Sequence, residues 1–416
     1  MTALGARPAR AVERVIYGGQ VRLVLPTSTA SLDPHDPEDL TAALLGPNVF
    51  EPLFARSASG QPYPTLADGL PTVEGGRILV RLRPELTSAR GRALTSTSVV
   101  ASLVRARRAL PLLAELGTPR AEGQLGFSLP SGDPHLVAQR LSLAATAIVP
   151  GDFRPESPQG SGAFAVTQVG RELTLKRNPN ASRGGALLAR VDVVRAELSD
   201  CLRAFEGGTS DLGWLGNGLH QPRAGAVPFQ LQVLGWVVVL GGKGLGKLRA
   251  PGVLQAALDA TKSRALDSLG YQRAPTASSL DFPGRDLIVA CPDDCPQLAA
   301  TATALGEAWS SSRSRVTVER EGRADLAARR RSGDFDVMLT FIATLEQTAR
   351  DVHAALLVAE GVSVPAQFIA ETPMRLARRL NLGVLGALAP HGATSSAWGQ
   401  LGSAAHLDLG GVERRR

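Results

Sequence analysis

The feature that most constrains the fold is a regular alternation of apolar runs and helical patterns between residues 286 and 341. The runs predict strands at 286–290, 315–319 and 335–341, and the segments between them predict helices at 297–309 and 324–331. This strand–helix order predicts a parallel sheet with right-handed crossovers. Upstream, residues 236–240 are continuously apolar, as is typical of a fully buried central strand. This part of the chain is therefore predicted to be of the α/β class.

The first half of the chain carries hairpin patterns instead. Residues 164–169 and 172–176 each alternate between apolar and polar side chains, with a two-residue turn between them. Gly160 and Gly162 precede this hairpin, at a point where the chain can bend sharply and let another backbone or a ligand approach. Pro179 ends the strand pairing because proline has no amide hydrogen to donate. Together with the parallel unit, the hairpin predicts mixed sheets.

A chain of 416 residues is too long for one ordinary hydrophobic core, so two or three lobes are expected. With 44% apolar and 20% charged residues, the composition is that of a globular protein. A net charge of +7 raises nucleic acid as a partner class. The arginine groups at 105–108, 329–331 and 414–416 are far apart in the sequence, however, and are interpreted as solvated helix faces and a tail. No nucleic-acid partner is predicted.

The segment 241–247, GGKGLGK, has the spacing of a phosphate-binding P-loop and follows a buried strand. Leu248 occupies the position at which a Ser or Thr hydroxyl reaches magnesium in such loops. Pro251 delays the next helix, whose amino end would otherwise meet the phosphates. The segment is therefore interpreted as a loop between lobes, and a nucleotide-binding enzyme is the least favoured class of function.

No other segment carries the pattern of a catalytic or metal centre. The six histidines are isolated and form no HxxxH or HExxH pair, so no zinc site is predicted. The glycine turn at 160–162 is too short for the nucleophile elbow of a hydrolase. Cys291 and Cys295 either close a small disulfide loop or remain free buried thiols, and Cys201 has no evident partner. The chain is predicted to have no enzymatic activity, catalytic residue, metal or cofactor.

Several short motifs resemble one family when they are taken in order. They are Leu-Asp-Pro at 32–34, the Gly-x-Gly-x-Phe turn at 160–164, the Arg-Asn-Pro exit at 177–179 and Gly-Asp-Phe-Asp at 333–336. In this order they resemble the family 5 extracellular solute-binding proteins, the peptide- and nickel-binding receptors of ABC importers. The resemblance covers about residues 17 to 413.

The resemblance implies an α/β, two-lobed periplasmic-binding-protein-like fold (type II) with mixed sheets, an inter-lobe ligand cleft and an inserted subdomain. Lobe I would hold residues 17–235, including the inserted subdomain at about 35–157. The chain would return to lobe I in a final segment at 365–416. Lobe II would hold residues 236–364.

The implied function is that of the substrate-binding component of an ABC importer. The chain would capture a peptide or another small solute, close by hinge motion at crossings near 235–242 and 360–366, and deliver the solute to permease subunits in the membrane. A monomer is implied. The alternative is a divergent intracellular or non-transport solute sensor or scaffold with the same fold.

The first residues of the chain bear on its location. Residues 1–20 lack the apolar core of a secretory leader, and no run approaches the ~20 apolar residues that span a bilayer. Taken alone, this pattern predicts the cytoplasm. The resemblance implies a periplasmic or extracytoplasmic, membrane-associated protein.

Five residues are predicted to contact the ligand. Thr27 follows the first strand, Trp214 and Phe341 end strands expected to face the cleft from the two lobes, and Trp236 begins the crossing strand. Glu346 lies where the resembled peptide receptors hold the peptide's amine with an acid, although their Asp-Tyr-Pro-Asp-Pro-like motif is absent here. A largely apolar pocket suits a small molecule or a short hydrophobic peptide. The sequence leaves open the ligand's identity, and whether the two tryptophans contact a ligand or the core.

Overall fold

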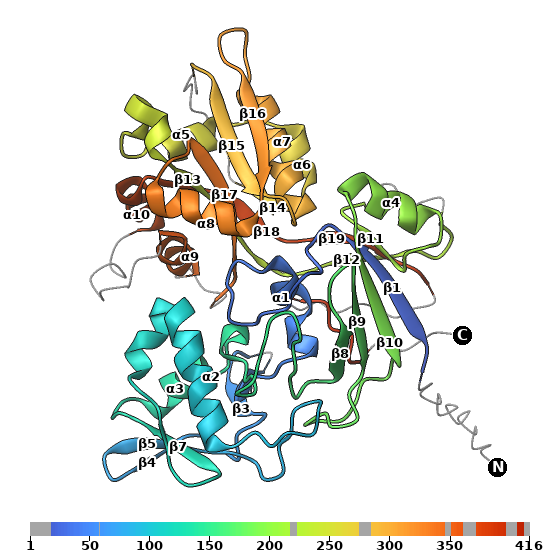
Figure 1. Ribbon diagram of the computed structural model, residues 1–416, viewed down its shortest axis with the longest axis vertical. Helices are drawn as coiled ribbons and strands as arrows, with labels where there is room; N and C mark the ends of the chain where they lie inside the picture. The colour runs from blue at the N-terminus through green and yellow to red at the C-terminus, as the bar shows by residue number, and fades with distance from the viewer. Residues whose placement is uncertain are drawn as a thin grey trace, which may run out of the picture.

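The computed structural model describes residues 18–57, 59–216, 223–273, 284–345, 351–360, 372–396 and 406–411. Its strands form five sheets with helices packed around them (Figure 1). In that view the sheet of lobe II lies at the top, the main sheet of lobe I at the right and the inserted subdomain at the lower left. The predicted two-lobed α/β fold with mixed sheets is confirmed.

Lobe I is built around a four-stranded sheet of order β1-β10-β9-β8. Its strands are β1 (Gln20–Leu25), β8 (Phe164–Gln168), β9 (Glu172–Arg177) and β10 (Arg190–Arg195). β8 and β9 pair antiparallel, which confirms the predicted hairpin, and β1 joins β10 in parallel. The lobe also holds helix α4 (Leu198–Glu206) and a smaller sheet of β11 (Leu212–Trp214), β12 (Val227–Gln230) and β19 (His391–Thr394).

The glycine turn before β8 is required by close backbone packing. A Cβ atom placed on Gly160 would lie 2.0 Å from the carbonyl oxygen of Val49. No side chain fits at that distance, so glycine is needed there. Within the same turn, the Ser161 hydroxyl donates to the buried carboxylate of Glu51 at 2.8 Å, and Arg183 donates to that carboxylate at 2.7 Å. The motif thus fixes β8 against the segment around residue 50.

Lobe II contains a six-stranded sheet of order β14-β18-β13-β17-β15-β16. The strands are β13 (Gly235–Gly241), β14 (Tyr271–Gln272), β15 (Leu287–Pro292), β16 (Val316–Glu321), β17 (Val337–Ala343) and β18 (Leu382–Leu388). β15 pairs in parallel with β16 and β17, which confirms the parallel unit predicted between residues 286 and 341. β13 pairs antiparallel with both of its neighbours.

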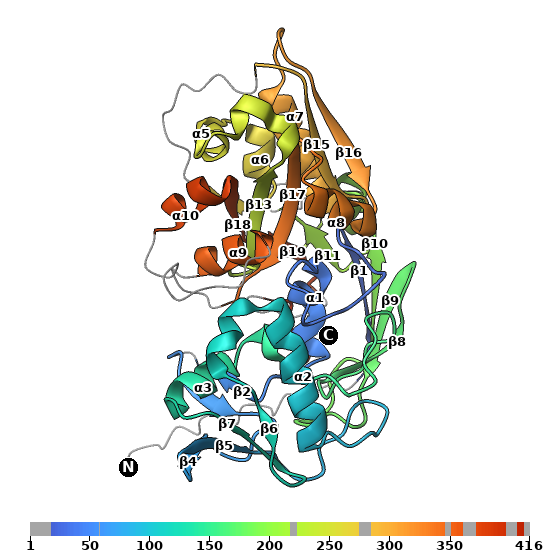
Figure 2. The ribbon, with the colours of Figure 1, turned by 60° about the vertical axis from the view of Figure 1, so that its left-hand side comes forward.

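Helices cover both faces of this sheet because its central strands are apolar on both sides (Figure 2). Val237 and Val239 share a core with α5 (Val253–Ala260), α6 (Arg264–Ser268) and α7 (Pro296–Trp309). Val238 and Leu240 share a second core with α8 (Arg323–Ser332), α9 (Asp351–Glu360) and α10 (Pro373–Leu380).

The carboxyl-terminal part of the chain departs from the predicted return segment. The prediction places residues 365–416 in lobe I, but α10 and β18 belong to lobe II. The apolar run of β18 pairs with β13 along its length and so completes the sheet. The chain returns to lobe I at β19, which pairs with β11 and β12. Of the crossing predicted near 360–366, only Glu360 lies within the described residues.

The inserted subdomain has its own hydrophobic core, formed by residues from Leu53 to Ile148 together with Leu345 from just beyond the end of β17 in lobe II. Its helices and turns are α2 (Ser96–Ala109), α3 (Pro134–Arg140), η2 (Pro111–Leu116) and η3 (Ala144–Thr146). Its strands are β2 (Phe54–Arg56), β3 (Pro62–Pro64), β4 (Thr72–Glu74), β5 (Arg77–Arg81), β6 (Arg120–Ala121) and β7 (Gly126–Leu129). The amide of Ile148 donates to the carbonyl of Glu51 at 2.9 Å, so the chain leaves and re-enters lobe I at one place.

The three cysteines are free and buried, so the disulfide considered for Cys291 and Cys295 is wrong. Burial raises the pKa of the Cys291 thiol to about 11 and that of Cys295 to about 12. Both thiols therefore act as small apolar core groups.

Candidate functional site

The interface between the lobes contains two of the predicted residues of lobe I. Trp214, at the end of β11, is completely buried, and its indole Nε1 donates to Oε1 of Gln297 at 3.1 Å. Thr27 is also completely buried, and its Oγ1 has no hydrogen-bond partner among the described residues. Thr27 directly follows Pro26, whose carbonyl accepts a hydrogen bond from the amide of Gln297 at 3.0 Å. Both predicted residues therefore lie where lobe I meets lobe II.

Gln297 is the residue that sequence analysis missed. It lies in the first turn of α7, a helix that begins at Pro296 and has no side-chain cap at Cys295. Its amide is satisfied by Pro26 of the other lobe, and its Nε2 donates to the carbonyl of Leu269 at 3.1 Å. The sequence offers one sign of this role, because the residue directly before the helix that begins at Pro296 is Cys295 rather than a Ser, Thr, Asp or Asn that could cap it. The first amides of such a helix need partners from elsewhere in the chain.

The predicted residues of lobe II fall on opposite faces of the sheet. Phe341 is buried and pairs with Val237 on the face that carries the core shared with lobe I. Trp236 is half-buried on the other face, where its Nε1 donates to the carboxylate of Asp351 at 2.8 Å. The structure therefore places Trp214 and Phe341 in one core and separates Trp236 from them. Glu346 lies outside the described residues.

Asp351, at the start of α9, also accepts hydrogen bonds from the Thr344 hydroxyl at 2.6 Å and the Leu345 amide at 2.6 Å. Burial raises the pKa of Asp351 above its usual value, while these donors lower it. No role was predicted for this acid from the sequence.

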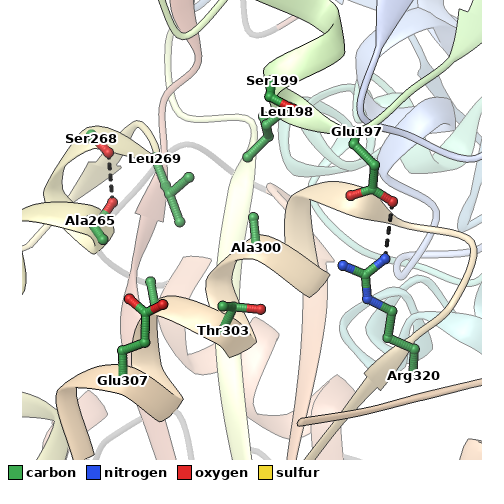
Figure 3. A pocket seen from close by; sticks show the side chains of 11 residues that line it. Glu197, Leu198, Ser199, Ala265, Ser268, Leu269, Ala300, Thr303, Glu307 and Arg320 are labelled. Atoms are coloured by element: carbon green, nitrogen blue, oxygen red, sulfur yellow. Dashed lines mark hydrogen bonds and ion pairs between the residues drawn. The ribbon is translucent and has the colours of Figure 1, made fainter.

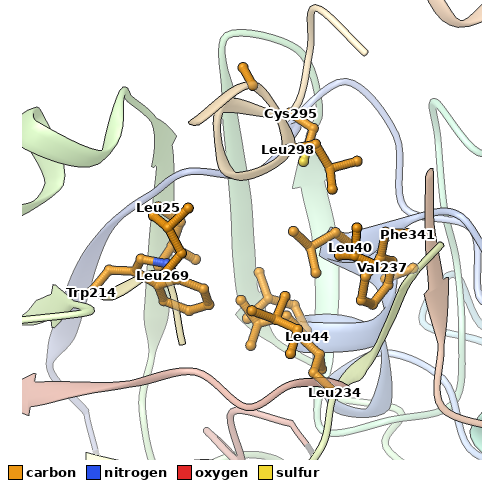
Figure 4. Close-up of a cluster of buried hydrophobic side chains, with 14 of the residues drawn as sticks. Leu25, Leu40, Leu44, Trp214, Leu234, Val237, Leu269, Cys295, Leu298 and Phe341 are labelled. Carbon is orange, nitrogen blue, oxygen red and sulfur yellow. The ribbon is translucent and has the colours of Figure 1, made fainter. Parts of the chain in front are cut away.

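Apolar side chains from both lobes meet at the interface (Figure 4). We call this set the inter-lobe cluster. It consists of Leu25 and Trp214 of lobe I, Leu40 and Leu44 of helix α1 (Leu40–Leu45), and Leu234, Val237, Leu269, Cys295, Leu298 and Phe341 of lobe II. Helix α1 lies between the two sheets and continues into the short turn η1 (Gly46–Asn48). Because these side chains are buried together, the lobes share one apolar core.

Ion pairs surround this core where it approaches solvent. In each pair the acid comes from lobe I or the segment 32–39, and the arginine comes from lobe II. The pairs are Glu197–Arg320 at 3.0 Å, Asp36–Arg323 at 3.7 Å and Glu38–Arg330 at 2.7 Å. The lobes are thus complementary in charge at the rim and apolar in the centre.

The segment 32–39 contacts all three parts of the molecule. Asp33 accepts from both terminal nitrogens of Arg105, on α2 of the inserted subdomain, at 2.8 and 2.5 Å. The carbonyl of Pro37 accepts from the amide of Ala343, at the end of β17 in lobe II, at 2.7 Å. This segment therefore fixes the relative positions of the subdomain and lobe II.

Two buried groups in the segment have shifted pKa values. Burial raises the pKa of Asp39, which caps α1 by accepting from the amide of Ala42, to about 6. Burial lowers the pKa of His35, whose Nε2 contacts the carbonyl of Ala147 at 2.8 Å, to about 4. In both cases the low dielectric of the interior disfavours the charged form.

A surface groove of about 310 Å³ lies at the rim, beside the Glu197–Arg320 pair (Figure 3). Its walls come from the start of α4 in lobe I and from α6, α7 and β16 in lobe II. The lining includes Leu198, Leu269, Ala300, Thr303 and Glu307. None of the predicted ligand-binding residues that the structure describes lines this groove.

The loop with P-loop spacing forms the turn η4 (Lys243–Arg249) and packs on the start of β17. Its amides are occupied: those of Gly242, Lys243 and Gly244 donate to the carbonyls of Asp336, Gly333 and Phe335 at 2.9, 2.8 and 2.9 Å. A P-loop needs such amides to point at phosphate oxygens. The arrangement therefore does not fit a phosphate cradle.

Comparison with solved structures identifies the fold. NikA from Staphylococcus aureus, in complex with Ni(L-His)2, matches with a TM-score of 0.71 and 14% identity over 96% of this chain and 100% of that chain. The oligopeptide-binding protein AppA from Bacillus subtilis, in complex with a nonapeptide, matches with a TM-score of 0.71 and 13% identity over 97% of this chain and 100% of that chain. The chain has the fold of the solute-binding proteins.

Other solute-binding proteins match over similar lengths. The murein tripeptide binding protein MppA from Escherichia coli has a TM-score of 0.71 and 12% identity over 97% of this chain and 99% of that chain. No protein-family model and no curated protein matches the chain. The resemblance inferred from the motifs is therefore confirmed at the level of the fold.

Two further observations concern the part of the chain that the structure describes. No group of three or more His, Cys, Asp or Glu residues in the described ranges is arranged to hold a metal ion. None of the helices in those ranges has the length and apolar character needed to cross a bilayer.

Proposed function

We propose that the chain is the solute-binding component of an ABC importer, which captures a peptide or another small solute between its lobes and delivers it to a membrane permease. The observation that carries the proposal is the two-lobed fold itself, shared along nearly the whole chain with proteins described as binding a nickel complex, a nonapeptide or a murein tripeptide. Capture and delivery involve no bond chemistry, so the proposed protein is a monomeric binding protein rather than an enzyme and acts outside the cytoplasmic membrane.

Closure of the lobes would occur about the chain crossings. One crossing leads from β12 into β13, and another leads from β18 into β19. A bound solute favours the closed form to the extent that it contacts both lobes. Thr27 and Trp214 on lobe I and Phe341 on lobe II are the proposed contacts, with Gln297 added as the polar bridge between the lobes.

The experiment uses two pools of dipeptides with the same apolar side chains. One pool has free termini, and the other is acetylated and amidated. Small-angle scattering is measured with and without each pool, and tryptophan fluorescence reports binding. Compaction with either pool is the expected result. Bound peptide with an unchanged radius of gyration contradicts closure, and no binding of either pool contradicts the proposed function.

A second candidate function is that of a scaffold or sensor whose lobes stay closed. The continuous apolar core that includes residues of both lobes favours it. Amide hydrogen exchange separates the two candidates, because the Gln297 amide is bonded across the lobes whereas the Val239 amide lies in the centre of a sheet. An importer component predicts faster exchange at Gln297 than at Val239 in the absence of solute. A closed scaffold predicts equally slow exchange at both.

A further inference from the structure

From the charged and polar groups at the interface we infer that the captured solute is uncharged, with an apolar body and a hydrogen-bonding group that meets the Thr27 hydroxyl. This inference rests on the proposed function and names the class of solute. It differs from capture of a zwitterionic peptide or a metal chelate, both of which present charges to the site.

The inter-lobe cluster offers no free charge to a solute. Among the described residues, no Lys or Arg is buried as a whole residue. Two guanidinium nitrogens that are buried without a hydrogen-bond partner, on Arg77 and Arg107, lie in the inserted subdomain. The nearly buried side chain of Arg273 already donates to the carbonyls of Leu258 and Thr261, so a solute carboxylate entering the inter-lobe cluster would find no free buried cation among the described residues there. The buried carboxylates already accept hydrogen bonds from the protein. They are Asp33, Asp39, Glu51, Asp192 and Asp351. A charged group buried without a partner is strongly disfavoured.

The arginines at the rim of the interface are already paired. Arg320, Arg323 and Arg330 each have an acidic partner across the interface. A solute carboxylate that bound one of these arginines would compete with that acid for the guanidinium donors. Whatever the solute gained from the arginine, the protein acid would lose in part, so the net gain in binding free energy would be small. The rim is therefore suited to closing the lobes rather than to recognising charge.

The hydroxyl of Thr27 is unsatisfied in the interior of the protein, because it is completely buried and has no hydrogen-bond partner among the described residues. Buried hydroxyls almost always find partners, and one that lacks a partner needs an explanation. Thr27 follows the residue whose carbonyl caps α7 of the other lobe, so a solute held between the lobes would lie within reach of this hydroxyl.

The two dipeptide pools test the inference, because they share their side chains and only the free pool carries terminal charges. The capped pool is expected to bind at least about tenfold more tightly than the free pool, since it buries no charge. Equal or tighter binding of the free pool would overturn the inference and leave the proposed function standing. Failure of both pools to bind would overturn both.

A pair of matched variants tests the role of Thr27. Thr27→Val removes a hydroxyl that has no partner, so it should leave thermal stability unchanged or higher while weakening binding of the capped pool by roughly tenfold. Thr41→Val is the control, because the buried Thr41 hydroxyl donates to the carbonyl of Ser28 and its loss should lower stability. Unchanged affinity in Thr27→Val, with a normal fold, would show that the hydroxyl does not meet the solute.

Discussion

Trp214 and Gln297 are 83 residues apart in sequence and belong to different lobes, yet the indole of one donates to the side-chain oxygen of the other at 3.1 Å. The backbone amide of Gln297 donates to Pro26 of lobe I, and its side-chain amide donates to Leu269 of its own lobe. One buried glutamine therefore bonds to two residues of lobe I and anchors itself to lobe II.

Replacing this glutamine is expected to destabilise the protein. Gln297→Met keeps the approximate volume but leaves the Trp214 indole and the Leu269 carbonyl without their partner. The free energy of unfolding should fall by about 2 kcal/mol, measured by urea denaturation. Gln272→Met, at an exposed position of β14, is the control and should change stability by less than about 0.5 kcal/mol. Equal effects of the two variants would contradict the bridging role.

The rim ion pairs predict that lobe closure depends on salt. Each pair is partly exposed and contributes only about 0–1 kcal/mol, but all of them favour the same closed form. Raising the salt concentration from about 0.1 M to about 1 M should shift the solute-free protein towards a larger radius of gyration. A variant combining Glu38→Gln, Asp36→Asn and Glu197→Gln should show the larger radius already at low salt. A radius of gyration that is the same in all these conditions would show that the ion pairs do not stabilise the closed form.

The lowered pKa of His35 is expected to make the folded protein less stable in acid. Its pKa is lowered from 6.5 to about 4 in the folded protein, so between these values the unfolded chain binds a proton that the folded chain does not. Stability therefore falls as the pH drops through this window, by about 3 kcal/mol at most. His35→Gln should remove this loss. The measurement is the free energy of unfolding against pH for parent and variant, and a constant difference between the two curves would contradict the prediction.

The pKa shift of Asp39 has the opposite effect on the pH dependence of stability, and Asp39 is still present in His35→Gln. Its pKa is raised from 3.8 to about 6, so in this window the folded chain holds a proton that the unfolded chain has released. Its contribution to stability therefore increases as the pH falls from about 6 towards 4. In His35→Gln, where the opposing group is gone, the stability curve should be flatter or rise in this range.

The glycine turn gives a prediction about the fold. Gly160→Ala would place a methyl group 2.0 Å from the Val49 carbonyl oxygen. The position of the methyl carbon is fixed by the backbone of residue 160, and the oxygen belongs to the backbone of Val49, so neither can move independently. We expect a loss of about 3 kcal/mol or more, or failure to fold. Gly151→Ala is the control, because nothing lies within 4 Å of its Cβ position and its φ is not positive. Thermal denaturation of both variants measures the difference, and a Gly160→Ala protein as stable as the control would show that the turn tolerates a side chain.

The parts of the fold that sequence predicted were those with a local signal. Apolar periodicity specified β15, α7, β16, α8 and β17, and the hairpin of β8 and β9, because each pattern lies within one stretch of chain. The apolar run of β18 did not reveal its neighbour β13, since strand pairing depends on residues far away in sequence. Gln297 carries no motif, and its role follows from contacts with Pro26 and Trp214 that exist only after folding. Trp214 and Trp236 looked equivalent in sequence, but the pleat of β13 turned Trp236 to the other side of the sheet.

The bond between Ile148 and Glu51 has a consequence for how such a chain can evolve. Both connections of the inserted subdomain meet at one point of lobe I. The stretch between them can therefore be lengthened, shortened or replaced as a unit. Its length and sequence can change without shifting the register of any strand in either lobe. Lineages with a longer or shorter stretch at this position would therefore keep the same lobes and differ mainly in the wall that the subdomain presents to α9.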